Sequence, residues 1–345
     1  MPIKTNKIRI ALTNLGKALV LPLVLYLLLL VLAGKRVGNW NSFVSILVLS
    51  VVPTICAYGV AFGFVSGMMD FSVGSRMIVS GMCAIIGGHY FGLAGMLLGA
   101  IISSVIMALI VGGLFATLKI PSLVVSLGTL MVFEIVSVRI ATGINSVIPG
   151  ISTGAYLKTP AALTFWGTPP WNFIVLIISA ILFRILNYCT EFATQARMVG
   201  SDELIATNIG IKPMKVKFVT FVYGGIFLGI SAMVSACYSS AVGSKCDLAS
   251  LAMVFKPMMA VIIGLALQQF VELEIGVFIG ALSMSVIFTG IIALGWPDSL
   301  QNVVLGLMML VVMASPNVRK QYQDYKRRKK THQSFEADIG QRAVS

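Results

Sequence analysis

Two short polar segments interrupt the long apolar runs of this chain, and the first has residues suited to binding a polar solute. Residues 67–75 read GMMDFSVGS. The carboxylate of Asp70, the hydroxyls of Ser72 and Ser75, and the glycines Gly67 and Gly74 form a polar kink at the boundary of a span. Two interpretations stay open. Asp70 or Ser72 caps the following helix, or the segment is unwound and lines a polar pathway.

The second polar segment, residues 199–211, has the pattern of a short helix outside the membrane. It reads VGSDELIATNIGI. Acidic residues at a helix start and glycine after its end are favourable for capping. We therefore predict a self-capped helix to which another protein can bind. Its residues are Ser201, Asp202, Glu203, Leu204, Ala206, Thr207, Asn208 and Gly210.

Two opposite charges, Glu134 and Lys256, fall inside apolar runs. A charge at the bilayer centre costs at least ~2.5–3.5 kcal/mol on insertion scales. Glu134 lies about six residues, or ~9 Å, and Lys256 about five residues, or ~8 Å, from the expected outer ends of their runs. This similar depth leaves three interpretations: a structural ion pair, a lysine that snorkels alone, or a gating or solute-binding role.

Other kinds of chemistry find little support in the sequence. The five cysteines and two histidines have no metal-ligand spacing, so we expect no metal or cofactor. The chain has no Gly-x-x-x-x-Gly-Lys-Ser/Thr loop for ATP. Much of the net charge of +13 lies in a tail that includes residues 326–330, KRRKK. A basic cluster directly after an apolar run favours anionic lipid as its partner rather than nucleic acid.

Composition places these residues in an all-α polytopic membrane protein. Hydrophobic residues make up 58% of the chain, charged residues 11%, and mean hydropathy is +0.96. About ten runs can cross the ~30 Å of hydrocarbon in a bilayer, counting a weaker, glycine-rich run over 74–88 for which a re-entrant segment is the alternative. The other runs are 18–34, 42–66, 92–116, 120–140, 172–188, 216–240, 251–267, 273–294 and 299–315.

Ten spans place both termini on one side of the membrane, and the basic residues indicate the cytoplasm. Most of them, Arg76 included, fall in the inner segments. The outer segments contain only Lys35, Arg36, Arg139, Lys158 and Lys245. We expect three parts: a cytoplasmic segment 1–17, a membrane domain 18–316 with a cytoplasmic loop 189–215, and a basic cytoplasmic tail 317–345. Val-Gly-Ser at 73–75 and again at 242–244 suggests an inverted repeat of five-span units.

The two polar segments together resemble the sugar-type permease subunits of bacterial ABC importers, which include ribose, galactose, xylose and autoinducer-2 permeases. That family carries Gly-x-Asp-Leu-Ser-Val-Gly-Ser after its second span. Here residues 69–75 read MDFSVGS, with Phe71 in place of leucine. It also has a cytoplasmic Gly-x-x-Glu-x-Ala-x-x-x-Gly-Ile loop that docks on the ATPase. Residues 200–211, GSDELIATNIGI, are similar with slightly altered spacing.

Two departures make this chain look like a diverged member. Residues 264–270, GLALQQF, replace a glycine-rich loop, and Lys256 stands where the family tends to have a carboxylate. The resemblance implies a permease subunit in the bacterial inner membrane, not an enzyme. It would translocate a sugar, a sugar-like solute or a nucleoside. Its partners would be an extracellular binding protein, a separate ATPase subunit, and a second permease subunit, identical or different. The alternative is an ion-coupled secondary transporter, for which Glu134 comes closest to an ion site.

Overall fold

The computed structural model describes residues 2–307 except 119, 298 and 302, and side chains only from residue 13, without that of Lys35. The chain divides into two compact units, Met1–Asp298 and Ser299–Ser345. Most of the expected span 299–315 and all of the basic tail 317–345 lie outside the described residues. The features below belong to the first unit.

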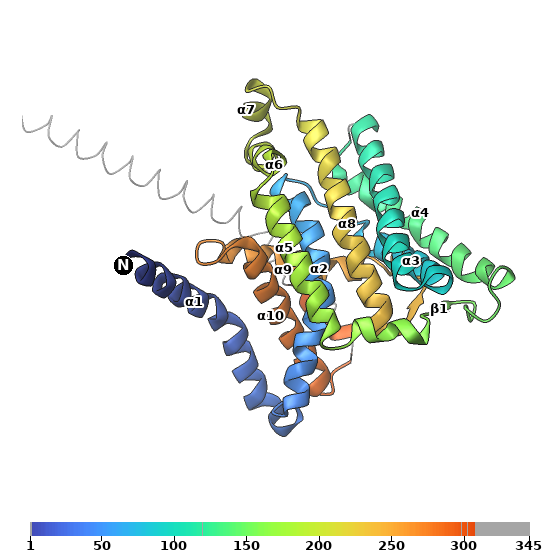
Figure 1. Cartoon of the computed structure of the whole chain (residues 1–345), viewed down its shortest axis with the longest axis horizontal. Coiled ribbons are helices and arrows are strands. Elements are labelled where there is room, and N and C mark those ends of the chain that lie inside the picture. Colours follow the sequence, from blue (N-terminus) through green and yellow to red (C-terminus); the bar gives the residue numbers. More distant parts are fainter. Residues whose placement is uncertain (1, 119, 298, 302, 308–345) are drawn as a thin grey trace, which may run out of the picture. The chain divides into compact units, whose positions relative to one another are not determined.

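Long apolar helices build this unit, and the all-α polytopic fold predicted from composition is confirmed (Figure 1). Short 3-10 helices follow α1 (η1, Gly34–Arg36) and α4 (η2, Ile144–Ser146), and a third precedes α5 (η3, Ala161–Gly167). The long helices are α1 (Pro2–Ala33), α2 (Trp40–Val65), α3 (Val73–Leu118), α4 (Ser122–Gly143), α5 (Trp171–Tyr188), α8 (Pro213–Ser239), α9 (Ala252–Leu267) and α10 (Leu273–Ala293). Two short helices, α6 (Glu191–Ser201) and α7 (Glu203–Asn208), connect α5 to α8.

The helix α3 is a hairpin of two helices. Its 46 residues would span ~69 Å at 1.5 Å per residue, about twice the hydrocarbon thickness. Phe91 and Gly92 have non-helical backbone angles, and Gly92 has φ +59°. Beyond this kink, Gly95 packs directly on Gly87, so the halves run back along each other. Counting α3 twice and including the shorter α9, the described residues contain nine of the ten expected spans.

Helix α8 packs along both α3 and α2, at the centre of the unit. A Cβ on Gly59 of α2 would lie 2.7 Å from the Gly224 carbonyl of α8, so glycine at position 59 permits this helix spacing. Aromatic rings fill the adjoining space, where Tyr58 stacks on Phe183 of α5 with ring centroids 4.8 Å apart. Phe227 of α8 packs edge-on against both rings.

One small two-stranded sheet interrupts the helical architecture. The strands β1 (Tyr156–Lys158) and β2 (Ala241–Gly243) pair antiparallel, with Leu157 opposite Val242. The sheet joins two connections at the end of the bundle away from α6 and α7 (Figure 1). Val242 therefore stands in a strand while Val73 begins a helix. The two Val-Gly-Ser tripeptides therefore differ in local structure, and the inverted repeat stays a prediction.

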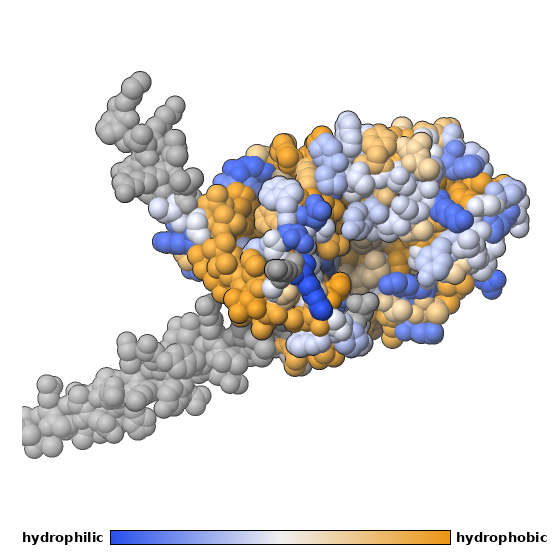
Figure 2. Space-filling model, turned by 90° about the horizontal axis from the view of Figure 1, so that it is seen from below, coloured by the Kyte–Doolittle hydropathy of each residue, from blue (hydrophilic) through white to orange (hydrophobic). Residues whose placement is uncertain are grey.

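The helix flanks expose many large apolar side chains. On α5, for example, Ile174, Ile177, Ile178 and Ile181 are exposed. Figure 2 shows large hydrophobic areas interrupted by hydrophilic residues. Such flanks suit contact with lipid or with another membrane subunit rather than with water.

Candidate functional site

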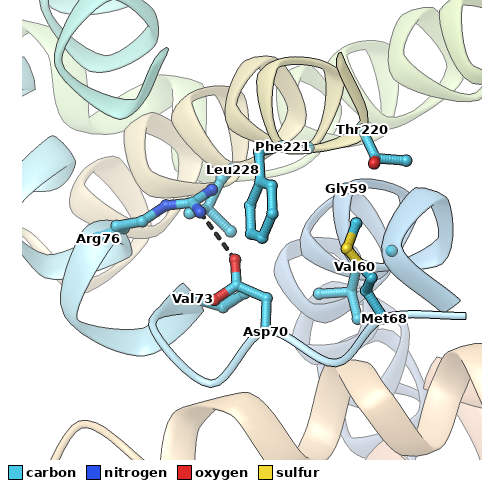
Figure 3. Close-up of a pocket in the computed structure, with 11 residues that line it drawn as sticks. Gly59, Val60, Met68, Asp70, Val73, Arg76, Thr220, Phe221 and Leu228 are labelled. Carbon is cyan, nitrogen blue, oxygen red and sulfur yellow. Dashed lines mark hydrogen bonds and ion pairs between the residues drawn. The ribbon is translucent and has the colours of Figure 1, made fainter. Parts of the chain in front are cut away.

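The first polar segment closes into a hydrogen-bonded turn at the start of α3. Asp70 Oδ1 accepts from the backbone N of Ser72 at 2.9 Å and from its hydroxyl at 2.6 Å. Its other oxygen accepts from Arg76 Nη1 at 2.8 Å, as Figure 3 shows. The Ser75 hydroxyl donates to the carbonyl of Ser72. The turn therefore leads directly into the first residues of α3.

Two charged residues of this turn, Asp70 and Arg76, line a small cavity. Asp70 and Arg76 face Thr220 and Phe221 of α8 and Gly59 of α2 across it (Figure 3). Its volume is about 20 Å³, which is room for roughly one water molecule. A solute larger than water cannot occupy it in this conformation.

The environment of Arg76 differs from the one predicted from the sequence. It was expected among the charges of an inner loop, but it is only 1% exposed. Asp70 neutralises it, while its Nε has no hydrogen-bond partner among the described residues. From the sequence alone, an arginine at a helix start is predicted to lie at the surface. Its burial depends on the packing of other helices around it.

Gly74 brings the start of α3 against the segment that precedes α9. Any Cβ at Gly74 would overlap the carbonyl oxygen of Ser250. The ring of Phe71 packs edge-on against Phe255 of α9, with centroids 6.5 Å apart. Helices α3 and α9 therefore begin beside each other. This is the arrangement in which two interrupted helices meet in the interior of a membrane protein.

The expected ion pair between Glu134 and Lys256 is not formed. Glu134 is 1% exposed, and its two oxygens accept from the backbone N of Leu248 at 2.9 Å and of Ser250 at 2.8 Å. Lys256 lies over the ring of Phe288, with Nζ 4.9 Å from the centroid. Similar depth did not make the residues partners, because backbone amides satisfy the carboxylate and an aromatic face receives the ammonium.

The second polar segment forms the short helix that the sequence predicts, and Asp202 caps it. Asp202 Oδ1 accepts from the backbone N of Leu204 at 2.9 Å and of Ile205 at 3.1 Å. Gly210 has φ +88° after the helix end, a conformation that glycine adopts without strain. Ser201 differs from the expectation, since it ends the preceding helix α6. The helix of the segment is therefore α7 alone.

Helix α7 presents apolar side chains to the outside. Leu204 is 77% exposed and Ile205 61% exposed, whereas Ala206 is fully buried. Glu203 pairs with Lys217 of α8 at 2.6 Å, which fixes the helix to the membrane bundle. Thr207 and Asn208 complete its last turn. The exposed apolar side chains of Leu204 and Ile205 are suited to binding a protein partner.

Helix α6 contacts the end of α2, next to the first polar segment. A Cβ on Gly200 would overlap the Val65 carbonyl, and Gly67, with φ +77°, lies against the Gly200 backbone. The close approach requires glycine at position 200, and the positive φ favours glycine at position 67. Helix α6 therefore lies directly against the chain that leads into the turn of Asp70.

Sequence reasoning missed an ionic cluster between α5 and α10. Arg184 Nη1 binds Glu274 Oε1 at 2.6 Å and also contacts Glu272. Glu274 is 6% exposed. The available signal was that one basic and two acidic residues occur near the expected inner ends of two separate spans.

Comparison with known proteins decides the family. Residues 42–313 match the family described as "Branched-chain amino acid transport system / permease component". The chain belongs to this family. It is therefore a permease component of a transport system, a multi-pass membrane protein and not an enzyme, and the ATPase activity of such systems lies in a separate subunit.

Relatives of this permease include several import proteins. It is 26% identical over 264 residues to the autoinducer 2 import system permease protein LsrC of Salmonella typhimurium (strain LT2), covering 75% of this chain and 73% of the relative. It is 27% identical over 278 residues to the galactofuranose transporter permease protein YtfT of Escherichia coli (strain K12), covering 79% of each. These low identities agree with a diverged member of the sugar-type ABC importer permeases.

Proposed function

We propose that this permease is the membrane-spanning subunit of a bacterial ABC importer for a sugar or sugar-like solute, possible solutes including nucleosides. An extracellular binding protein delivers the solute, and a separate ATPase drives its passage. Alternating access moves the solute without covalent chemistry in this chain. Both termini, together with α6 and α7, face the cytoplasm in this proposal.

The observation that carries the proposal is the exposed helix α7, which follows helix α6, the helix that lies against the first polar segment. Its apolar residues Leu204 and Ile205 offer a docking knob for the ATPase. Through Gly200 and Gly67, movement of α6 and α7 is passed to the turn of Asp70. This gives a direct mechanical route from ATP hydrolysis to the interior of the bundle.

The names of the relatives favour the sugar class. LsrC is named for autoinducer 2 and YtfT for galactofuranose, while the family description names branched-chain amino acids. The hydroxyl and charged groups around Asp70 and Arg76 support a polar solute rather than an apolar one. The ion-coupled alternative loses support, because backbone amides occupy both oxygens of Glu134.

The remaining assembly follows from the same proposal. Two permease subunits form the pathway, and the departures at 264–270 and Lys256 support a second permease of a different kind about as well as they support a diverged homodimer. The domain limits stay as proposed: segment 1–17, membrane domain 18–316 and tail 317–345. The basic tail is assigned to anionic lipid.

Affinity purification of the tagged chain from its native membrane tests the proposal. We expect an ATPase with a phosphate-binding loop and a solute-binding protein to co-purify. Leu204→Asp should lose the ATPase, whereas Val147→Asp, which also places a charge at an exposed apolar position but lies in the connection between α4 and β1, should retain it. A complex without any ATPase would overturn the importer assignment. Mass analysis of the same complex separates a homodimer from a pair of different permeases.

A further inference from the structure

The connection from β2 to α9, residues 244–251, has an unusual backbone. Asp247 and Leu248 both have positive φ, at 58° and 62°. Residues without glycine's freedom rarely adopt this conformation, which is unfavourable for them. The side chains from Cys246 to Ala249 are exposed, while Ser250 is buried. The segment thus runs from the surface into the bundle under strain.

Glu134 holds this strained segment in place. One carboxylate oxygen accepts from the amide of Leu248 and the other from the amide of Ser250. One turn further along α4, the hydroxyl of Ser137 accepts from the backbone N of Lys245 at 3.4 Å. Hydrogen bonds to an ionised carboxylate are about twice as strong as neutral ones. The carboxylate therefore opposes the tendency of the backbone to relax.

The held segment ends against the first polar segment. The carbonyl of Ser250 fills the space beside Gly74, and the hydrogen bonds of Glu134 fix the amide of the same residue. Neither Gly74 nor Ser250 leaves room for a solute between α3 and α9. Without the hydrogen bonds from Leu248 and Ser250 to Glu134, residues 244–251 would be free to move away from the bundle. They would move on the side where Cys246 is exposed.

We propose that Glu134 is a positioning residue that latches residues 244–251 against Gly74, and that this segment is the outer gate of the solute path. The gate role rests on the proposed function, but the latch does not. The latch requires only that the segment opens when the carboxylate is lost. Opening exposes Ser250 from the side of the β-sheet, the outer side in the proposed orientation.

Cysteine labelling tests the latch without any partner protein. Ser250→Cys places a thiol at the buried position, where the native Ser250 hydroxyl has no hydrogen-bond partner among the described residues. Cys189→Ser and Cys246→Ser remove the two exposed thiols. A membrane-impermeant maleimide is then added outside intact cells. The background without Ser250→Cys measures labelling of the remaining cysteines.

The labelling rate should respond to the carboxylate specifically. We expect slow labelling with Glu134, and labelling at least about tenfold faster with Glu134→Gln, equivalent to about 1.4 kcal/mol. Glu134→Asp keeps the charge and should restore partial protection. Arg139→Gln, which removes an exposed charge from the same helix, should leave the rate unchanged. Equal rates for Glu134 and Glu134→Gln would overturn the latch.

A second measurement tests the gate. In the complex with its co-purified ATPase, trapping with ATP and vanadate should change the labelling rate of Ser250→Cys at least about threefold, and Glu134→Gln should abolish this difference. A rate that is the same in trapped and untrapped complexes overturns the gate. Failure to recover any ATPase contradicts the proposed function instead, and the labelling in cells still decides the latch.

Discussion

Arg184 Nη1 lies 2.6 Å from Glu274 Oε1, although the two residues are 90 positions apart in the sequence. The contact joins the end of α5, which leads into α6, to the start of α10. The second oxygen of Glu274 is buried without a hydrogen-bond partner among the described residues. Arg184 is thus the charged partner of this buried carboxylate.

Loss of Arg184 should therefore destabilise the protein more than joint loss of both charges. We expect Arg184→Met to cost roughly 1–3 kcal/mol, because it leaves a buried carboxylate unpaired, with the half-exposed arginine reducing the effect. Adding Glu274→Gln should recover part of the loss. Thermal unfolding of the purified protein and a double-mutant cycle measure this. Additive effects would contradict the pairing.

Asp202→Ala should loosen α7 without unfolding the bundle. Removal of an N-cap side chain costs about 0.5–2 kcal/mol, and here the bonds lost are to the amides of Leu204 and Ile205. Hydrogen exchange at these two amides should become roughly fivefold faster or more. Thr207→Ala, a change inside the same helix that keeps the cap, serves as control. Unchanged exchange in Asp202→Ala would count against the cap.

Gly74→Ala should disrupt the junction of α3 and α9. The added Cβ would overlap the carbonyl of Ser250, and overpacking of this kind typically costs about 1–3 kcal/mol. Gly128→Ala is the matched control, because no atom lies within 4 Å of its added Cβ, and alanine favours a helix by about 0.5–1 kcal/mol. Thermal unfolding should separate the two variants. Equal midpoints would refute the close contact.

The thiol of Cys246 should respond to its neighbour Asp247. A hydrogen bond to this carboxylate, followed by its negative charge, raises the pKa of Cys246 above the ordinary value. Asp247→Asn should lower that pKa and increase the fraction of reactive thiolate at pH 7–8. Maleimide labelling in a Cys189→Ser background should be faster in the variant at these pH values. The two rates should converge once the pH exceeds both pKa values, and a ratio independent of pH would contradict the assignment.

Much of this structure could be predicted from local signals in the sequence. Apolar run length predicted the helices, and the Asp202 and Gly210 pattern predicted α7, because spans and caps depend on neighbouring residues. The weak glycine-rich run over 74–88 forms the first half of α3, a helix of its own up to the kink at Phe91 and Gly92.

Long-range partners could not be derived in the same way. Glu134 was matched to Lys256 by depth, but which residues meet is set by the rotation of each helix and by the path of its connections. The amides of Leu248 and Ser250 meet Glu134 in a segment whose backbone is left-handed at Asp247 and Leu248. The burial of Arg76 likewise depends on α2 and α8 closing around it.

The kink of α3 bears on how the chain enters the bilayer. Only Phe91 and Gly92 separate the two halves, and the nearby residues His89 and Tyr90 add no acidic, lysine or arginine side chain. The tip that must be carried across the hydrocarbon is therefore short and nearly free of charge, which keeps the cost of translocating it low. Both halves can insert together as a preformed pair, with Gly87 and Gly95 already in contact. A charged residue introduced at position 91 should lower the efficiency of membrane insertion without changing the packing of the folded helices.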